Sequence, residues 1–463
     1  MTQTHVSGDA AHAAARDRLC AQYAAIPPGQ PVRLSKRTSN LFRPRVALDT
    51  PGLDVRAFDR VLSVDPERLV ADVQAMTTYE HLVDATLAVG CMPLVVPQLK
   101  TITVGGAVTG LGIEASSFRN GLPHESVREM EILTGSGEVV TARPEGEYAD
   151  LFRTFPNSYG SLGYALRLQV ELERVHPFVR LRHVRFSSLD ALQAAIGTVV
   201  GSRAYEGDAV DFVDGVVFSA DEAYLTLGTW SDSAPFTSDY TGQQVFYRSI
   251  RERSRDHLTV RDYLWRWDTD WFWCSRAFGA QHPVVRRLWP RRYLRSDVYW
   301  KLVAFENRHH VFARLDARRG KPAQERVVQD VEIPLERTAD FLRWFLRKVP
   351  IEPIWLCPLA LRDTEVSRHA WPLYPLLPGQ TYVNVGFWSS VPIVEGRADG
   401  DVNRAIEAEV HALGGHKSLY SDAYYDQEEF ARLYGGEAYA PVKARYDPQG
   451  RLPTLYDKAV RRR

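Results

Sequence analysis

Residues 101–121 read TITVGGAVTGLGIEASSFRNG, and this stretch decides the fold. Glycine is frequent in it, and small side chains or hydroxyls separate the glycines. Glycine adopts backbone conformations closed to other residues and lets another surface approach closely. Successive N–H groups in such a turn form a cradle for anionic oxygens. The stretch therefore predicts the wall against which a flat, phosphate-bearing cofactor lies. The residues expected to form this wall are Thr101, Thr103, Gly105, Gly106, Thr109, Gly110, Gly112, Ile113, Ser116, Ser117 and Gly121.

Two other interpretations of this stretch are weaker. Its central glycines, with Ala115, satisfy the dinucleotide pattern G-x-G-x-x-G/A, and Glu131 lies about twenty residues further on. That pattern must open a helix after a buried strand, but Gly121 and Pro123 would break such a helix within about three turns. A solvated surface loop is also disfavoured, because apolar residues alternate with the glycines too regularly.

The segments that follow predict a shell around the cofactor. Residues 127–141, VREMEILTGSGEVVT, predict a strand, a turn and a second strand. The sequence DLF at 150–152 comes next, then YGSLGYA at 159–165, and then an alternating strand over 166–172. In this order, the motifs resemble the flavin-binding domain of the vanillyl-alcohol-oxidase/p-cresol-methylhydroxylase (PCMH) superfamily, and in particular that of the delta(24)-sterol reductases. Gly160 and Gly163 join the expected cofactor residues.

The resemblance covers almost the whole chain from about residue 30. It implies an α+β fold: a two-lobed PCMH-type FAD-binding domain and an α+β cap, or substrate, domain with an antiparallel sheet. The expected divisions are a helical segment over 1–29, the FAD-binding domain over 30–177, the cap over 178–415 and a segment over 416–463 that returns to the flavin.

A first pyrophosphate loop is expected near residues 35–42. Hydroxyls, amides and positive charges suit phosphate oxygens, although a charged hairpin tip would have the same composition. Many relatives attach flavin covalently through a histidine or cysteine in this loop. Residues 35–43 contain neither, so we predict non-covalent FAD. The candidate side chains are Ser35, Lys36, Arg37, Thr38 and Ser39.

Composition excludes several function classes. The 463 residues contain 57 Lys plus Arg and 57 Asp plus Glu, so the absence of a basic excess argues against a nucleic-acid partner. The four cysteines show no C-x-x-C spacing and imply no metal site. No signal peptide and no apolar run of the ~18–20 residues that span a bilayer is visible. We expect a cytoplasmic protein and leave peripheral membrane contact open.

The expected substrate wall is aromatic. Residues 263–273, YLWRWDTDWFW, contain four tryptophans, and a fifth lies in PIWLCP at 353–358. Such a cluster is equally compatible with an ordinary core and with a pocket for a large apolar substrate. The substrate candidates are Trp265, Trp267, Trp271 and Trp355.

Three residues are candidates for catalysis, by analogy of position within the family. Asp330 is either a proton relay or a strand-end cap. Lys443 would face the N1/C2=O edge of the isoalloxazine and stabilise the anionic reduced flavin; otherwise it is a helix-end charge. Tyr420 and Tyr424 would lie at the mouth of the pocket, and Tyr424 is the catalytic candidate.

The resemblance implies an FAD-dependent reductase that uses NADPH to reduce a C=C bond of a sterol or isoprenoid lipid. An FAD-linked alcohol oxidase or dehydrogenase is the first alternative, and a non-catalytic flavin or lipid carrier is the second. The sequence indicates no separate nicotinamide motif.

Overall fold

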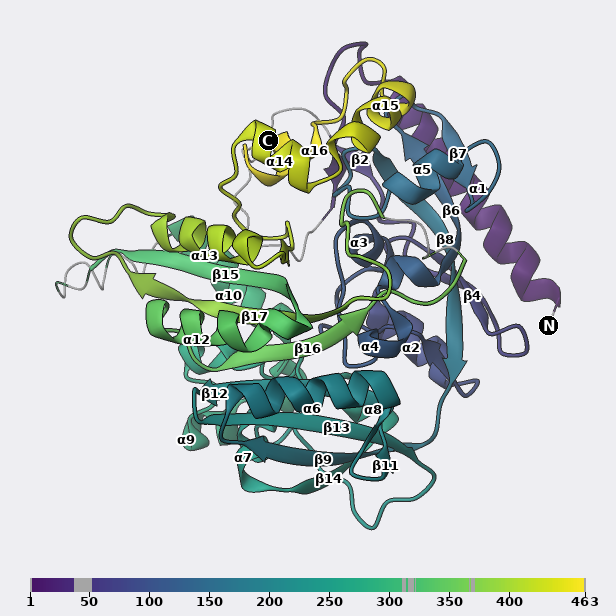
Figure 1. Ribbon diagram of the computed structural model, residues 1–463. Helices are drawn as coiled ribbons and strands as arrows, with labels where there is room; N and C mark the ends of the chain where they lie inside the picture. Colours follow the sequence, from purple (N-terminus) through teal and green to yellow (C-terminus); the bar gives the residue numbers. More distant parts are fainter. Residues whose placement is uncertain are drawn as a thin grey trace.

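A computed structural model describes residues 2–36, 52–309, 314, 320, 322–365, 367 and 371–461. Two antiparallel sheets with helices packed on them make up the molecule (Figure 1). The expected α+β class with an antiparallel second sheet is confirmed. The helix α1 (Thr2–Ala24) lies within the helical segment expected over residues 1–29.

The first sheet has six strands, and adjacent strands run antiparallel. Its order is β3 (Val61–Asp65), β4 (Val70–Gln74), β8 (Gly163–Arg174), β6 (Val127–Thr134) and β7 (Val139–Ala142), with β5 (Cys91–Pro93) paired to β8. The strand–turn–strand prediction for 127–141 is confirmed. Alternate residues of β8 are buried, because one face of the strand packs on the core. Strands β1 (Leu34–Ser35) and β2 (Leu53–Asp54) form a separate parallel pair.

Short helices cover the face of this sheet that the glycine-rich stretch approaches. They are α2 (Tyr79–Leu87), α3 (Val104–Thr109), the 3-10 helix η1 (Pro123–Ser126) and α5 (Ala149–Thr154). The short helix α4 (Ser117–Asn120) instead packs on β16 (Ile354–Ala360) of the second sheet. The glycine-rich stretch is thus partly helical, whereas the sequence predicted a turn. Its first helical turn begins where the Thr103 hydroxyl caps the chain.

The second sheet has eight antiparallel strands. Its order is β14 (Arg255–Thr259), β9 (Phe178–Phe186), β13 (Glu222–Ser231), β12 (Phe212–Ser219), β16 (Ile354–Ala360), β17 (Thr381–Pro392), β15 (Gln324–Pro334) and β18 (His416–Lys417). The hairpin β10 (Ala204–Tyr205) and β11 (Asp208–Ala209) stands apart from it.

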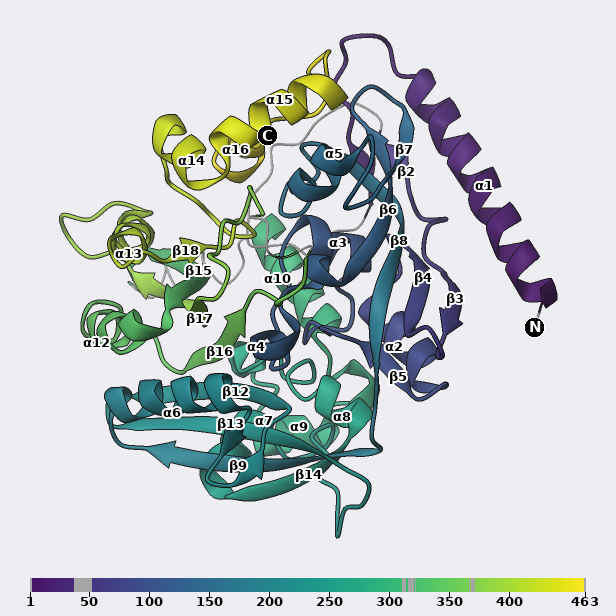
Figure 2. The ribbon, with the colours of Figure 1, turned by 45° about the vertical axis from the view of Figure 1, so that its right-hand side comes forward.

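The two faces of this sheet belong to different cores. Helices α6 (Leu189–Ser202), α12 (Thr338–Lys348) and α13 (Asp401–Ala412) lie along one face, as Figures 1 and 2 show. Ile354 and Leu356 of β16 pack into that core, while Trp355 and Cys357 join the core of the first sheet on the other side. The period-two alternation of β16 therefore directs Trp355 toward the first sheet.

A further group of helices lies between strands of the second sheet. Between β13 and β15 lie α7 (Phe246–Glu252), α8 (Val260–Leu264), η2 (Cys274–Phe278), α9 (Pro283–Leu288), η3 (Arg291–Tyr293) and α10 (Ser296–His309). The turn η4 (Leu335–Arg337) precedes α12. No helix in the described part of the chain combines the length and apolar character needed to cross a membrane.

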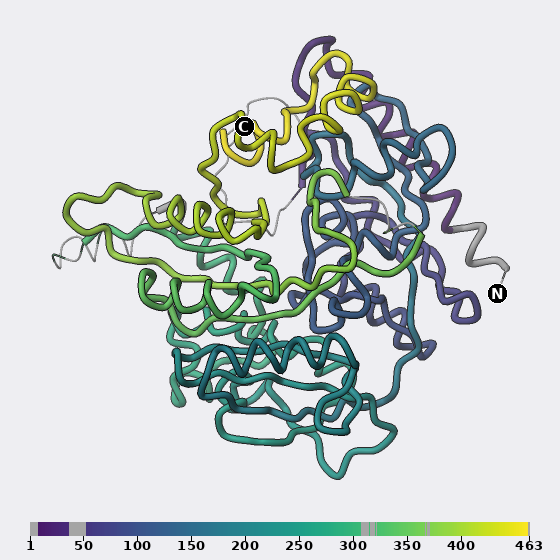
Figure 3. Tube along the Cα trace, in the orientation of Figure 1, coloured from purple at the N-terminus to yellow at the C-terminus, as the bar shows by residue number. Residues whose placement is uncertain are grey.

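The C-terminal segment returns to the first sheet. Figure 3 shows the last part of the trace beside residues near 150. It contains α14 (Gln427–Leu433), α15 (Gly436–Tyr446) and α16 (Leu455–Ala459), and the amide of Ser136 donates to the carbonyl of Tyr446. This return brings residues near 420 and 458 close to the glycine-rich stretch.

Candidate functional site

A cavity of about 570 Å³ lies where the two sheets face each other, a size typical of cofactor and ligand sites. The glycine-rich stretch, the start of β8 and the C-terminal segment form one part of its wall, and β15, β16 and β17 form another. Of the expected cofactor residues, the cavity is lined by Lys36, Thr101, Thr103, Gly105, Gly106, Thr109, Gly110, Gly112, Ile113, Gly160 and Gly163.

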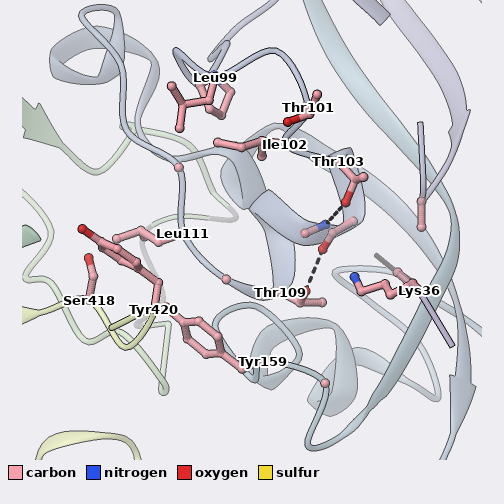
Figure 4. A pocket seen from close by; sticks show the side chains of 18 of the residues that line it. Lys36, Leu99, Thr101, Ile102, Thr103, Thr109, Leu111, Tyr159, Ser418 and Tyr420 are labelled. Atoms are coloured by element: carbon pink, nitrogen blue, oxygen red, sulfur yellow. Dashed lines mark hydrogen bonds between the residues drawn. The ribbon is translucent and has the colours of Figure 1, made fainter. Parts of the chain in front are cut away.

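Glycine is required at Gly105 because α3 packs tightly on the first sheet. A Cβ at Gly105 would lie 2.7 Å from the Cβ of Ala75. The amide of Gly105 donates to the carbonyl of Ala75 at 2.9 Å, and the Thr109 hydroxyl donates to the carbonyl of Gly105 at 2.7 Å (Figure 4). The helix therefore presents its backbone, rather than bulky side chains, to the cavity.

The N–H groups that could bind an anion lie further along the chain than the glycines for which they were predicted. The amide of Gly106 donates to the Thr103 hydroxyl at 3.1 Å, and that of Gly110 donates to the carbonyl of Gly106 at 2.9 Å. These groups are occupied, because the turn winds into a helix. The next three residues, 111–113, line the cavity, and no hydrogen bond joins their N–H groups to another described residue. The N–H groups that can donate hydrogen bonds to a ligand are therefore those of residues 111–113, which follow α3.

Five polar side-chain atoms of the cavity wall lack hydrogen-bond partners in the described part of the chain. They are Gln98 Nε2, Thr101 Oγ1, Trp300 Nε1, Asn384 Oδ1 and Ser418 Oγ, and all five are shielded from solvent. A buried polar atom without a partner costs about 1–3 kcal/mol. These atoms fit a ligand that carries many hydrogen-bonding groups, as FAD does.

Basic side chains gather at the end of the cavity near α3. Lys36 and Lys458 both line it, and Figure 4 shows Lys36 beside Thr109. Lys458 Nζ donates to the carbonyls of Tyr159 and Gly160 at 3.1 and 2.9 Å. Gly160 has a φ of +77°, a conformation that favours glycine. This end suits the pyrophosphate of a dinucleotide.

A hydrogen-bonded acid group lies elsewhere in the wall. Asp330 of β15 accepts a hydrogen bond from the Asn384 amide at 3.1 Å, and the Tyr420 hydroxyl is bonded to the same carboxyl group. Trp388 Nε1 donates to the Tyr420 hydroxyl at 2.9 Å. Burial by the surrounding protein raises the pKa of Asp330 to about 6, against the lowering effect of these hydrogen bonds. Burial also raises the pKa of Tyr420 well above its ordinary value.

An aromatic wall adjoins this acid group. The ring of Phe272 lies 4.4 Å from that of Trp388 and 5.3 Å from that of Trp355. Trp271 packs edge-on against Trp300 at 6.2 Å. Trp271 and Phe272 adopt φ of +46° and +60°, which is a strained region for side chains of this size. Such strain persists only where the surroundings enforce it, so the two rings are held in place by the packing around them.

Two expected substrate residues lie outside this wall. Trp267 is buried and donates from Nε1 to Asp214 at 2.9 Å. The Asp214 carboxylate also accepts from the fully buried Arg266 at 2.7 Å, and Arg266 in turn bonds Glu114 at 3.1 Å. Trp265 is likewise a core residue. The core interpretation therefore holds for these two tryptophans, while Trp271 and Trp355 reach the cavity.

Three expected cofactor residues of the glycine-rich stretch also lie off the cavity. The hydroxyl of Ser116 donates to the carbonyl of Leu94 at 2.8 Å, and that of Ser117 accepts from the Glu114 amide at 3.0 Å. Gly121 faces the side chain of Glu125. These residues support the loop, because α4 turns the chain away from the cavity.

Ser35 is exposed and lies in β1 without lining the cavity. Arg37, Thr38 and Ser39 fall outside the described residues.

The structure places Lys443 and Tyr424 away from the cavity lining. Lys443 Nζ donates to the carbonyls of Ser161 and Leu452, each at 2.8 Å, and to Asp447 at 2.6 Å. All three of its protons are used, so it ties α15 to the first sheet. Tyr424 packs against the Arg404 guanidinium, 5.1 Å from the ring centre. The sequence-based catalytic roles for these two residues are therefore corrected, whereas Asp330 lies in the cavity wall.

Sequence reasoning missed several residues of the wall. Asn384 and Trp388 share one face of β17 through period-two spacing, and this signal could have found them once Asp330 was assigned to the paired strand. Phe272, Trp300, Ser418 and Lys458 carry no such signal, because they come from irregular segments or from distant helices.

Comparisons with known proteins agree with this geometry. Residues 14–143 match the FAD binding domain family. The chain is similar to the delta(24)-sterol reductase of Arabidopsis thaliana, with 25% identity over 446 residues, 89% of this chain and 77% of that protein. The Homo sapiens delta(24)-sterol reductase is 25% identical over 411 residues, 86% of this chain and 75% of that protein. Cytokinin dehydrogenase 3 of Arabidopsis thaliana is 29% identical over 163 residues, 34% of this chain and 29% of that protein. The resemblance predicted from the motifs is confirmed.

Proposed function

We propose that this chain, an FAD-dependent oxidoreductase similar to delta(24)-sterol reductases, reduces a carbon–carbon double bond of a sterol or other isoprenoid lipid, with NADPH as reductant. The observation that carries the proposal is the composition of one cavity. It combines unpartnered polar atoms, an aromatic wall and a hydrogen-bonded acid group. The first suits the cofactor, the second suits an apolar substrate and the third suits proton transfer.

The cofactor fits the residues that are present. Thr101, Lys36 and the backbone of residues 111–113 would hold FAD, together with the glycines of α3. When bound, FAD supplies hydride transfer at its N5 atom. No histidine or cysteine is among the described residues that line the cavity, which supports a dissociable cofactor.

Reduction of a double bond also requires a proton at the second carbon. Tyr420 and Asp330 are hydrogen-bonded titratable groups in the cavity wall. The raised pKa of Tyr420 keeps its hydroxyl protonated at neutral pH, and the Asp330 carboxyl, with a pKa of about 6, can resupply the proton. Asn384 holds the carboxyl in place through its amide.

The aromatic wall would orient the substrate and exclude water. Phe272, Trp355 and Trp388 offer ring faces and edges rather than charged groups. A fused-ring or isoprenoid lipid gains roughly 25 cal/mol for each Å² of apolar surface that it buries. The proposed substrate is therefore large and hydrophobic, and a cytoplasmic protein that contacts membranes at their surface would meet it.

Anaerobic mixing of the FAD-loaded protein with NADPH tests the direction of the reaction. We expect the flavin absorbance to bleach, and then to recover when a sterol with an unsaturated side chain is added, with the saturated product detected by mass spectrometry. Bleaching by an alcohol but not by NADPH would instead support an alcohol oxidase or dehydrogenase. A purified protein that takes up no FAD would support a carrier.

A further inference from the structure

Exposed apolar side chains concentrate in one segment of the surface, residues 282–305, which contains α9, η3 and most of α10. Ten large hydrophobic side chains are exposed in the described part of the chain, and six of them lie in this segment. Leu288 is 78% exposed and Val284 is 62% exposed. Single exposed hydrophobics are ordinary, but a gathered set marks an interaction surface. The other four are Val285, Tyr293, Leu302 and Phe305.

We propose that the surface of residues 282–305, called here the docking segment, binds an anionic lipid bilayer. The proposal deepens the proposed function, on which it rests for the lipid nature of the substrate. It names the face through which the protein would reach that lipid.

Charge complementarity favours an anionic partner. The docking segment contains six Arg and Lys residues and one Asp. Acids elsewhere in the chain pair with three of these cations, Arg286, Arg291 and Arg295, and Asp297 also pairs with Arg295 and Lys301. The exposed Arg287 and Arg292 form no ion pair with another described residue, and they supply the positive charge of the surface. Arg287 lies between Val284 and Leu288 in sequence. Apolar residues interspersed with arginines are typical of segments that lie in the interface of a bilayer.

The docking segment is held firmly by the protein beneath it. Arg286 is buried, and it forms an ion pair with Asp270 at 2.6 Å and donates to the carbonyl of Gln244 at 3.0 Å. This anchor fixes α9 while its apolar neighbours Val284 and Leu288 remain exposed. An exposed apolar surface on a fixed helix binds without a large ordering cost.

The docking segment adjoins the wall of the cavity. Trp289, at the end of α9, lies 6.3 Å from the ring of Tyr299 in α10. The next residue, Trp300, lines the cavity and contacts Trp271. Helix α10 therefore separates the cavity from the exposed surface of the docking segment: Trp300 lines the cavity, and Leu302 is exposed on the other side of the same helix.

A second copy of the chain is a poorer occupant. A two-fold contact through this surface would bring the same set of arginines face to face. An anionic bilayer would instead attract these arginines electrostatically, which favours binding.

Vesicle co-sedimentation of the FAD-loaded full chain tests the proposal. We expect binding to phosphatidylcholine vesicles that contain phosphatidylserine, weaker binding to phosphatidylcholine alone, and weakening by salt. The variants V284S/L288S and R287E/R292E should each reduce binding at least about tenfold. The matched controls V394S and R185E alter exposed residues outside the segment and should bind like the unaltered protein.

Three results would overturn the proposal. These are no binding to anionic vesicles, unchanged binding of both segment variants, or a dimer in solution that V284S/L288S converts to a monomer. Flavin bleaching by NADPH and turnover of a detergent-dispersed substrate are measured on the same samples. If these reactions proceed while vesicle binding fails, only the docking proposal falls; if vesicles bind but no lipid is reduced, only the proposed function falls.

Discussion

The side-chain amide of Asn384 donates a 3.1 Å hydrogen bond to the carboxyl group of Asp330 from the adjacent strand of the second sheet. The contact fixes an acid in the wall of the cavity, where Tyr420 also bonds it. Substituting D330N or Y420F should lower kcat by about 100-fold or more, because a positioned proton donor typically contributes that much. Stopped-flow bleaching by NADPH should remain close to normal, since it precedes the protonation. The exposed D340N is the matched control, and equal loss of both half-reactions in D330N would contradict the assignment.

The rate of substrate reduction should depend on pH through Asp330. Burial raises the pKa of this carboxyl to about 6, so the acid is protonated below that pH and ionised above it. A step that needs the protonated form should therefore slow as pH rises through about 6. Profiles of turnover against pH for the unaltered protein and for D330N check this expectation. If the fall in rate near pH 6 persists unchanged in D330N, a group other than Asp330 causes it.

Gly105 should tolerate no side chain. In G105A the new Cβ would lie 2.7 Å from the Cβ of Ala75 and 2.9 Å from its carbonyl oxygen. Overpacking of this kind costs roughly 1–3 kcal/mol, and α3 would shift into the cavity. Thermal unfolding and FAD titration should both show the loss. G201A is the control, because nothing lies within 4 Å of its Cβ in α6 and alanine favours the helix.

The Asp214 carboxylate should be necessary for folding. It bonds the guanidinium of Arg266 and the indoles of Trp267 and Trp355, at 2.7, 2.9 and 3.3 Å. D214A leaves a buried arginine with only Glu114 as an acidic partner, and breaking a buried pair costs about 3–5 kcal/mol. Denaturant unfolding measures the change. The variant D208A removes a half-buried surface carboxylate that pairs with Arg180 and Arg182, and it should lose much less stability. Comparable losses in the two variants would refute a special role for Asp214.

Acid should unfold the protein partly through His124. Burial lowers the pKa of this imidazole to about 3, and neither ring nitrogen has a hydrogen-bond partner among the described residues. The unfolded chain binds the proton near pH 6.5, so the stabilising effect is complete above that pH and is lost as pH falls toward 3. Between about pH 7 and pH 4 the melting temperature of the unaltered protein should therefore fall by more than that of H124F.

Regular patterns in the sequence located most of the sheet framework. The alternation in β8 and the turn between β6 and β7 are local features, and the structure places strands where they were expected. The glycine-rich stretch was assigned to the correct wall but not to the correct conformation. Helix α3 forms there because the backbone of residues 75 and 77 accepts its first amides, and local sequence does not reveal such a distant partner.

Side-chain roles were harder to predict because they depend on contacts between distant segments. Lys443 looks like a free cation in sequence, but two carbonyls and Asp447 take its protons. Trp267 and Trp271 belong to one aromatic run, yet one meets Asp214 in the core and the other reaches the cavity. In an irregular segment no periodicity indicates which of two neighbouring tryptophans faces which way.

The lysine at position 458 has a consequence for biosynthesis. It lines the cavity and donates to the carbonyls of residues 159 and 160, about three hundred positions earlier in the chain. When the ribosome has translated the glycine-rich stretch, it has therefore made only one part of the cavity wall. The nascent polypeptide would complete its cofactor chamber only after α16 has emerged from the exit tunnel, and FAD would not bind fully while the glycine-rich stretch is being translated.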